Sequence, residues 1–135
     1  MTFCRIAFCL VCFAWAQTRP TLAVLDLRAA GTLSSDEVSG LTARLESEVL
    51  RLGSFRVLEH TQMAAILREQ GFQQSGICDS KECQIQVGQL LGVCYLLTGA
   101  VGRVGSITTM DIRVINVETG EIVHSEARDV RGGLE

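Results

Sequence analysis

The clearest pattern of apolar and polar residues lies in the second half of the chain. Val93–Val101 is an almost unbroken apolar run, which is typical of a strand buried on both faces. Thr108–Val117 instead alternates: apolar residues occupy every second position from Met110 to Val114, with charged residues between them. This period of two indicates an antiparallel strand that is covered on one face. Glycine-rich and polar reversals join these strands to each other and to a third strand, Glu121–Val130.

The first half of the chain predicts two further strands with a helix between them. Thr21–Leu27 and Phe55–Glu59 are short apolar runs that indicate buried strands. Ser34 or Ser35 is suited to cap the intervening helix, and Gly53 is suited to end it. A strand, a helix and a strand at this spacing form a βαβ unit, so the two strands should be parallel with a right-handed crossover.

Two more helices precede the apolar run, one capped by Thr61 and one over Lys81–Leu91. The order of elements therefore predicts an α/β fold, a three-layer sandwich around a five-stranded mixed sheet. Numbered along the chain, the strands should lie in the order 2-1-3-4-5, with strand 4 antiparallel to the others and helices on both faces.

The first sixteen residues have the sequence pattern of a signal peptide. A short segment with one positive charge precedes an apolar stretch, and Ala14–Ala16 fits an A-x-A cleavage site. We therefore expect residues 1–16 to be removed and residues 17–135 to form a single domain, which is exported to the periplasm or associated with the outer membrane. The alternative is a buried N-terminal helix or strand. Lipidation at Cys9 or Cys12 is disfavoured because the residue before each is large.

Composition narrows the classes of partner. The chain is 47% hydrophobic and 20% charged, which is globular rather than disordered. Removal of Arg5 with the signal peptide would change the formal net charge from −3 to −4. Without a basic patch, nucleic acid is not an expected partner, nor is an anionic membrane surface. After removal of the signal peptide we expect no membrane-spanning region.

Two cysteines flank a predicted helix start. If Asp79 is the N-cap, Glu82 stands at N3, and Cys78 and Cys83 occupy the positions that a hydrophobic staple brings together. A structural disulfide between Cys78 and Cys83 is therefore expected, and an oxidising compartment permits it. A metal site would need more ligands and a redox pair would favour the C-x-x-C spacing, so neither is expected. Cys94 is expected to be an inert core thiol.

A ligand crevice is the remaining candidate for chemistry. In the predicted topology the switch point lies between strands 1 and 3, and Asp26, His60 and Thr98 should lie near it. An Asp–His pair could do acid–base work there. Alternatively, Asp26 caps a loop and His60 precedes a helix cap. No set of nucleophile, base and orienting group is visible, so we expect no catalytic residues, no cofactor and no enzymatic activity.

The motifs resemble a known superfamily. FRVLEHTQMAAILREQGFQQSG and VGQLLGVCYLLTGAVGRVGSITTMDIRVINVETGEIV are similar to the CsgG-type curli-assembly family. They are also similar to its envelope relatives, the LpoB-like activators of penicillin-binding proteins and the N-terminal domain of TolB. The similarity spans Leu22 to Val130 and implies an anticodon-binding-domain-like sandwich. Pore-forming members carry long amphipathic hairpins, whereas the reversals here are short.

These observations favour an exported accessory or assembly factor of the cell envelope that is CsgG- or LpoB-like and acts by protein–protein contact without catalysis. The expected partner is an envelope protein, and an oligomer is compatible with this interpretation. One alternative is a subunit of a curli-type secretion channel. Another is a small-ligand-binding domain that uses the crevice between strands 1 and 3.

Overall fold

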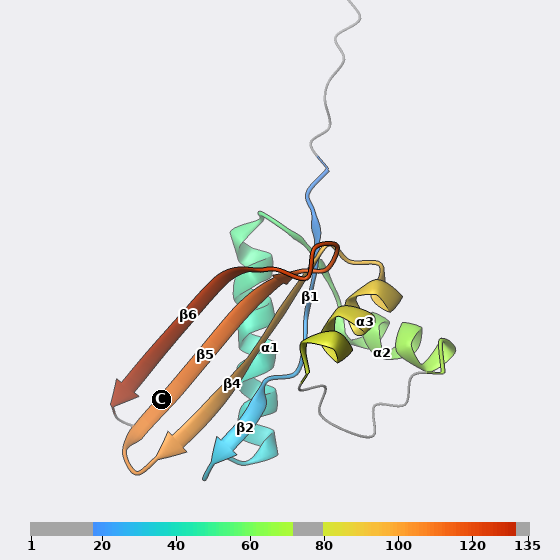
Figure 1. The fold of residues 1–135 in the computed structure, drawn as a ribbon. Helices are drawn as coiled ribbons and strands as arrows, with labels where there is room; N and C mark the ends of the chain where they lie inside the picture. The colour runs from blue at the N-terminus through green and yellow to red at the C-terminus, as the bar shows by residue number, and fades with distance from the viewer. Residues whose placement is uncertain (1–17, 72–79, 132–135) are drawn as a thin grey trace, which may run out of the picture.

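The computed structural model describes residues 18–71 and 80–131, which form one sheet with helices on both faces (Figure 1). The strands are β1 (Thr21–Val24), β2 (Arg28–Gly31), β3 (Arg56–Leu58), β4 (Tyr95–Val104), β5 (Ile107–Asn116) and β6 (Ile122–Arg131). The helices are α1 (Ser35–Leu52), α2 (His60–Glu69) and α3 (Lys81–Leu91). The predicted signal peptide, residues 1–16, lies outside the described residues.

The sheet has the predicted strand order. It runs β3-β1-β4-β5-β6, with β1 parallel to β3 and to β4. The pairs β4–β5 and β5–β6 are antiparallel, which confirms the prediction that the strand now labelled β5 runs against the others. β2 is a sixth strand that continues the line of β1 and pairs with the second half of β4.

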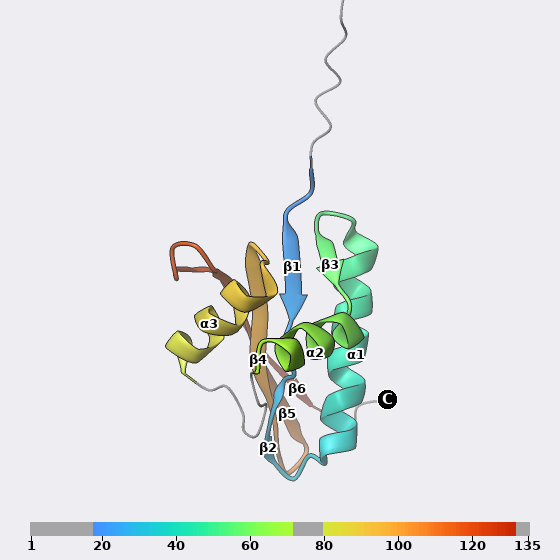
Figure 2. The same ribbon diagram turned by 90° about the vertical axis from the view of Figure 1, so that its right-hand side faces the viewer.

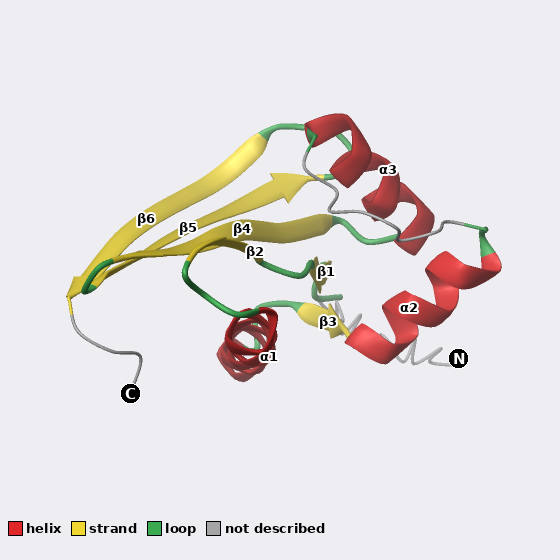
Figure 3. Cartoon of the chain, turned by 90° about the horizontal axis from the view of Figure 1, so that it is seen from below, coloured by secondary structure: helices red, strands yellow, loops and turns green. Residues whose placement is uncertain are grey.

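The core has two halves, one on each face of the sheet. On one face, α1 packs over a cluster that includes Leu22, Val24 and Leu97. On the other face, α2 and α3 pack over a cluster that includes Ala23 and Leu96 (Figure 2). The strands β4, β5 and β6 extend beyond α2 and α3 toward the β4–β5 hairpin (Figure 3). The outer end of the sheet is therefore covered less than its centre.

The first predicted strand is broken, and this corrects the prediction of one strand over Thr21–Leu27. Leu25 packs in the cluster under α2 and α3, whereas Leu27 packs in the cluster under α1. In a regular strand, residues two apart share a face. The segment between β1 and β2 therefore shifts the face by one residue, as a bulge does. Asp26, at the centre of this segment, is exposed.

The start of α1 is fixed by a capping box. The backbone N–H of Glu37 donates to the Ser34 hydroxyl at 3.2 Å, and the backbone N–H of Ser34 donates to the Glu37 carboxylate at 2.9 Å. The second bond is the main reason that the pKa of Glu37 lies below its ordinary value. The contribution of this carboxylate to stability is therefore present above pH 4.5 and is lost as the pH falls through the lowered pKa.

Replacing Ser34 should destabilise the protein. Ser34→Ala leaves the amide of Glu37 without its capping acceptor and should lower the free energy of unfolding by about 1 kcal/mol. Urea denaturation followed by circular dichroism measures this change. Ser39→Ala is the matched control, because Ser39 is an exposed position inside α1 where alanine favours the helix. Equal stability of the two variants would contradict the capping role.

Candidate functional site

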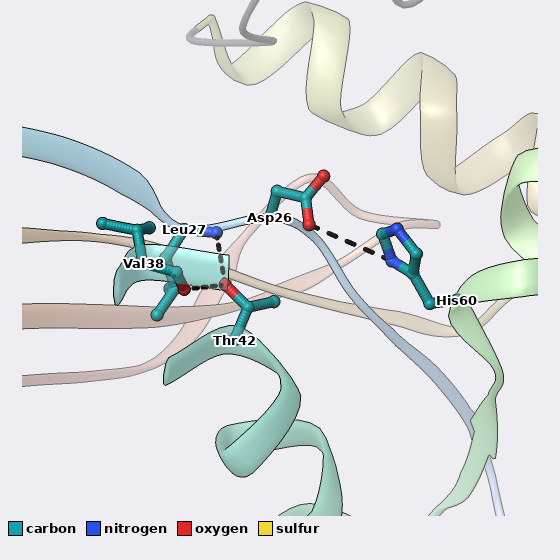
Figure 4. A network of polar contacts seen from close by, with 5 residues as sticks. All are labelled: Asp26, Leu27, Val38, Thr42 and His60. Atoms are coloured by element: carbon teal, nitrogen blue, oxygen red, sulfur yellow. Dashed lines mark hydrogen bonds and ion pairs between the residues drawn. The ribbon is translucent and has the colours of Figure 1, made fainter. Parts of the chain in front are cut away.

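Asp26 and His60 lie beside each other at the end of β1. His60 is the first residue of α2, whose N-cap is Glu59, so the prediction that Thr61 caps this helix is wrong. The Nδ1 atom of His60 is 3.9 Å from Oδ1 of Asp26, and the two side chains point toward each other (Figure 4). The His60 side chain is 51% exposed and that of Asp26 is 58% exposed. The structure thus brings the two residues together, but in a position open to water.

The segment that carries Asp26 is anchored on its other side by Thr42. The backbone N–H of Leu27 donates to Oγ1 of Thr42 at 3.2 Å, and the Thr42 hydroxyl donates to the carbonyl oxygen of Val38 at 2.9 Å (Figure 4). Leu27 is 5% exposed and Thr42 is 4% exposed, so this hydroxyl takes the place of water as the acceptor for the buried amide of Leu27. In the sequence, Thr42 is marked only as a small polar residue on the apolar side of α1, which does not predict this role.

Removing this hydroxyl should destabilise the break between the strands. Thr42→Val keeps the shape but leaves the buried amide of Leu27 without an acceptor, which should cost about 1 to 3 kcal/mol of unfolding free energy. Ser47→Ala is the control, since its hydroxyl also donates to the carbonyl four residues earlier but lies on the exposed side. That variant should change stability by less than about 0.5 kcal/mol. A similar loss of unfolding free energy in the two variants would contradict the anchoring role of Thr42.

Thr98 is not part of the Asp26–His60 pair in the structure. Its side chain is 7% exposed, and its Oγ1 accepts a hydrogen bond of 3.4 Å from Nε2 of Gln84 in α3. Thr98 therefore joins α3 to β4. It lines a separate pocket, to which β2, α3, β4, β5 and β6 all contribute residues. Asp26 and His60 are not among the residues that line this pocket.

The pocket beside Thr98 is small and charged. Its volume is about 120 Å³, well below the 300 to 1,000 Å³ typical of sites for drug-sized ligands. Arg28, Lys81 and Arg113 contribute positive charge. The guanidinium of Arg113 is paired with the carboxylate of Asp111 at 3.2 Å. The expected three-residue crevice is thus divided between an exposed pair and a pocket on the α3 side, and its role in ligand binding stays a prediction.

Within residues 18–71 and 80–131, no three His, Cys, Asp or Glu side chains are grouped so that they could hold a metal ion. Over the same residues, none of the helices has the length and apolar character needed to cross a membrane.

The cysteines depart from the sequence analysis in two ways. The N-cap of α3 is Ser80 rather than Asp79, because the Ser80 hydroxyl accepts from the backbone N–H of Cys83 at 3.1 Å. Cys83 is therefore at N3 instead of N4. Cys78 lies outside the described residues, so its pairing with Cys83 stays a prediction. Cys94 is exposed, so the prediction that it is a core thiol is wrong; it directly precedes β4, and the buried residue at this point of the chain is its neighbour Val93.

Counting thiols tests the predicted disulfide. The chain from Gln17 onward contains Cys78, Cys83 and Cys94, and a bond between the first two leaves Cys94 as the reactive thiol. Titration with a thiol reagent under denaturing, non-reducing conditions should find one thiol per chain. A Cys94→Ser variant should then show none. Three thiols in the unsubstituted chain would refute the disulfide.

The outer edge of the sheet is a second candidate surface. β6 is ten residues long, pairs with β5 on one side, and every one of its residues is exposed. Its central side chains carry charges of both signs: Nε of Arg128 donates to Oε1 of Glu126 at 2.9 Å, and Nε2 of His124 is 3.8 Å from Oε2 of Glu126. The strand was predictable from the sequence, whereas its charged, exposed edge was not.

Three solved structures define the class of fold. The LpoB C-terminal domain from Salmonella enterica superposes with a TM-score of 0.71 at 18% identity, over 87% of each chain. Lipoprotein GNA1162 from Neisseria meningitidis gives a TM-score of 0.62 at 16% identity, over 85% of this chain and 82% of the other. TolB from Acinetobacter baumannii gives 0.52 at 14% identity, over 87% of this chain and 24% of TolB.

These similarities confirm an α/β fold shared with LpoB and with part of TolB, as the sequence motifs implied. The resemblance to the CsgG-type family stays a prediction. The chain belongs to the DUF3280 family, described as "Protein of unknown function (DUF2380)", whose model matches residues 21–135. No protein with a curated description matches it.

Proposed function

We propose that this protein is an exported accessory or assembly factor of the cell envelope, and that it acts by binding another protein rather than by catalysis. The observation that carries the proposal is β6, an outer strand of ten exposed residues. An exposed strand of this length offers a row of backbone donors and acceptors to which another protein can add a strand. Most strands in globular proteins are shorter, so β6 presents an unusually long edge.

The signal-peptide pattern of residues 1–16 supports export. The fold that this chain shares with LpoB and with a lipoprotein, GNA1162, is compatible with a role in the envelope. The motifs that resemble the CsgG-type family extend this to a CsgG- or LpoB-like accessory role. Its mode of action would be contact with an envelope protein partner.

The alternatives have less support. An acid–base site at Asp26 and His60 would need closer contact and protection from water, whereas the pair is 3.9 Å apart and more than half exposed. A ligand that bridged Asp26, His60 and Thr98 would have to span two separate places in the fold. A secretion-channel subunit would need membrane hairpins, whereas β4 and β5 are paired with each other along their whole length and are both held within this sheet by their other neighbours.

Export and contact can be tested in one bacterial strain. The full chain, with a C-terminal tag, should lose its first sixteen residues and become sensitive to protease once the outer membrane is opened. A photo-crosslinking residue in place of Ser125 on β6 should then give a discrete adduct in living cells. The same residue in place of Arg44, an exposed position on α1, is the matched control and should give none.

Two results would contradict the proposal. An uncleaved chain that stays with cytoplasmic markers would remove the envelope role. Equal adducts from the Ser125 and Arg44 positions, or none from Ser125, would remove β6 as the contact surface. The mass of the adduct separates two kinds of partner, because a different protein adds its own mass whereas a second copy doubles that of this chain.

A further inference from the structure

The charges on β6 constrain what can pair with it. Glu126 and Arg128 are two residues apart, so they project from the same face of the sheet. Their register partners Ile112 and Met110 in β5 pack toward α1, which places both charges on the α1 face. Ala127 lies between them and projects from the opposite face. The centre of β6 thus consists of an acidic residue, a small residue and a basic residue in succession: Glu126, Ala127 and Arg128.

A second copy of the same edge can pair only in certain registers. Two identical strands that pair side by side in antiparallel directions are related by a two-fold axis perpendicular to the sheet. This axis keeps the α1 face of one copy on the same side as the α1 face of the other. Residues opposite each other must therefore come from the same face of β6. A register is therefore allowed when the axis is level with one residue, which then lies opposite its own copy. It is not allowed when the axis is level with the point midway between two successive residues.

The register centred on Ala127 matches the charges. It places Glu126 of each copy opposite Arg128 of the other, so four charges of alternating sign surround the axis. Opposite side chains in an antiparallel pair have Cβ atoms about 4.5 to 5.5 Å apart, which is within reach of a salt bridge. Arg128 binds its own Glu126 through Nε, and its side chain is 74% exposed. Its two terminal nitrogens can therefore donate to the second carboxylate.

The two neighbouring allowed centres do not match. An axis through Glu126 sets two carboxylates against each other, and an axis through Arg128 sets two guanidinium groups against each other. Like charges directly opposite each other destabilise a strand pair. Ala127 on the axis instead brings two methyl groups together on the other face. The charges therefore favour one register and oppose its neighbours.

We propose that β6 pairs with β6 of a second copy of this chain, in an antiparallel, two-fold symmetric contact centred on Ala127 that joins two sheets into one. This deepens the proposed function, because it names a second copy as a protein that the β6 edge binds. It can fail while a contact with a different envelope protein remains.

The test uses charge reversal on the full chain, purified from whichever compartment holds it. The unsubstituted chain should sediment as a monomer–dimer equilibrium. Glu126→Arg and Arg128→Glu should each weaken self-association by about tenfold, because each sets like charges opposite one another. Mixing the two variants should restore a dimer that contains one copy of each. A tag on only one variant shows this by retaining the other at a one-to-one ratio.

Mixing separates a contact between copies from a contact within one copy. Each reversal also breaks the pair of Glu126 with Arg128 inside its own chain, and mixing does not repair that pair. Restoration on mixing therefore requires the residues to meet across copies. Glu48→Arg in α1 is the matched control: it breaks an exposed pair with Arg51 and makes the same change in charge, but should leave association unchanged.

A second substitution covers the case in which the reversed variants fold poorly by circular dichroism. Ala127→Glu sets two carboxylates on the axis and should abolish the dimer, whereas Ala127→Thr, which favours a strand, should keep it. A chain that stays monomeric at all concentrations overturns the proposal. A dimer unaffected by substitutions at Glu126, Ala127 and Arg128 also overturns it. A β6 adduct with a different protein, together with a monomeric mass, would leave only the proposed function standing.

Discussion

The burial of β4 is the constraint on which the rest of the structure depends. β4 pairs with β1 and β2 on one side and with β5 on the other, and helices pack over both faces of its first part, around Leu96 and Leu97. Close approach is needed between β4 and β5 and between α3 and the end of β5. A Cβ atom on Gly99 would lie 2.1 Å from the carbonyl oxygen of Asp111 in β5, and one on Gly88 would lie 2.6 Å from Cγ2 of Val117. These glycines let a strand and a helix approach as closely as they do.

The break between β1 and β2 lies beside β4, since β1 pairs with the first part of β4 and β2 with its second half. The one-residue shift at the break sends Leu25 to the cluster under α2 and α3 and Leu27 to the cluster under α1. Thr42 satisfies the amide that the shift frees from the sheet. The exposed carboxylate of Asp26 is a by-product of this geometry. Its contact with His60 is therefore explained by backbone packing, with no need for a catalytic role.

The strand order could be predicted because it depends on features that can be read from the sequence alone. These are the apolar runs, the short reversals and the βαβ spacing, whose crossover has a known handedness. The sequence missed the break at Asp26, because Thr21–Leu27 is equally apolar on both sides of the shift. It placed the cap of α3 at Asp79 because Asp79 and Ser80 are both good caps, and only the fold chooses Ser80. It grouped Thr98 with Asp26 and His60 because strand order does not say which face a side chain occupies.

The outer edge differs from the core in what determines its residues. In the core, volume and hydrogen bonding determine the residue, as Thr42 and Gly99 illustrate. On β6 every side chain is exposed, so packing places little constraint on Glu126 and Arg128, and the fold requires only that they be soluble. Charges on an edge strand oppose pairing with unrelated strands, because an arriving strand must desolvate them or match them. A partner that matches them in sign and spacing avoids this cost. The residues that keep such an edge soluble therefore also limit which strands can bind it, and in which register.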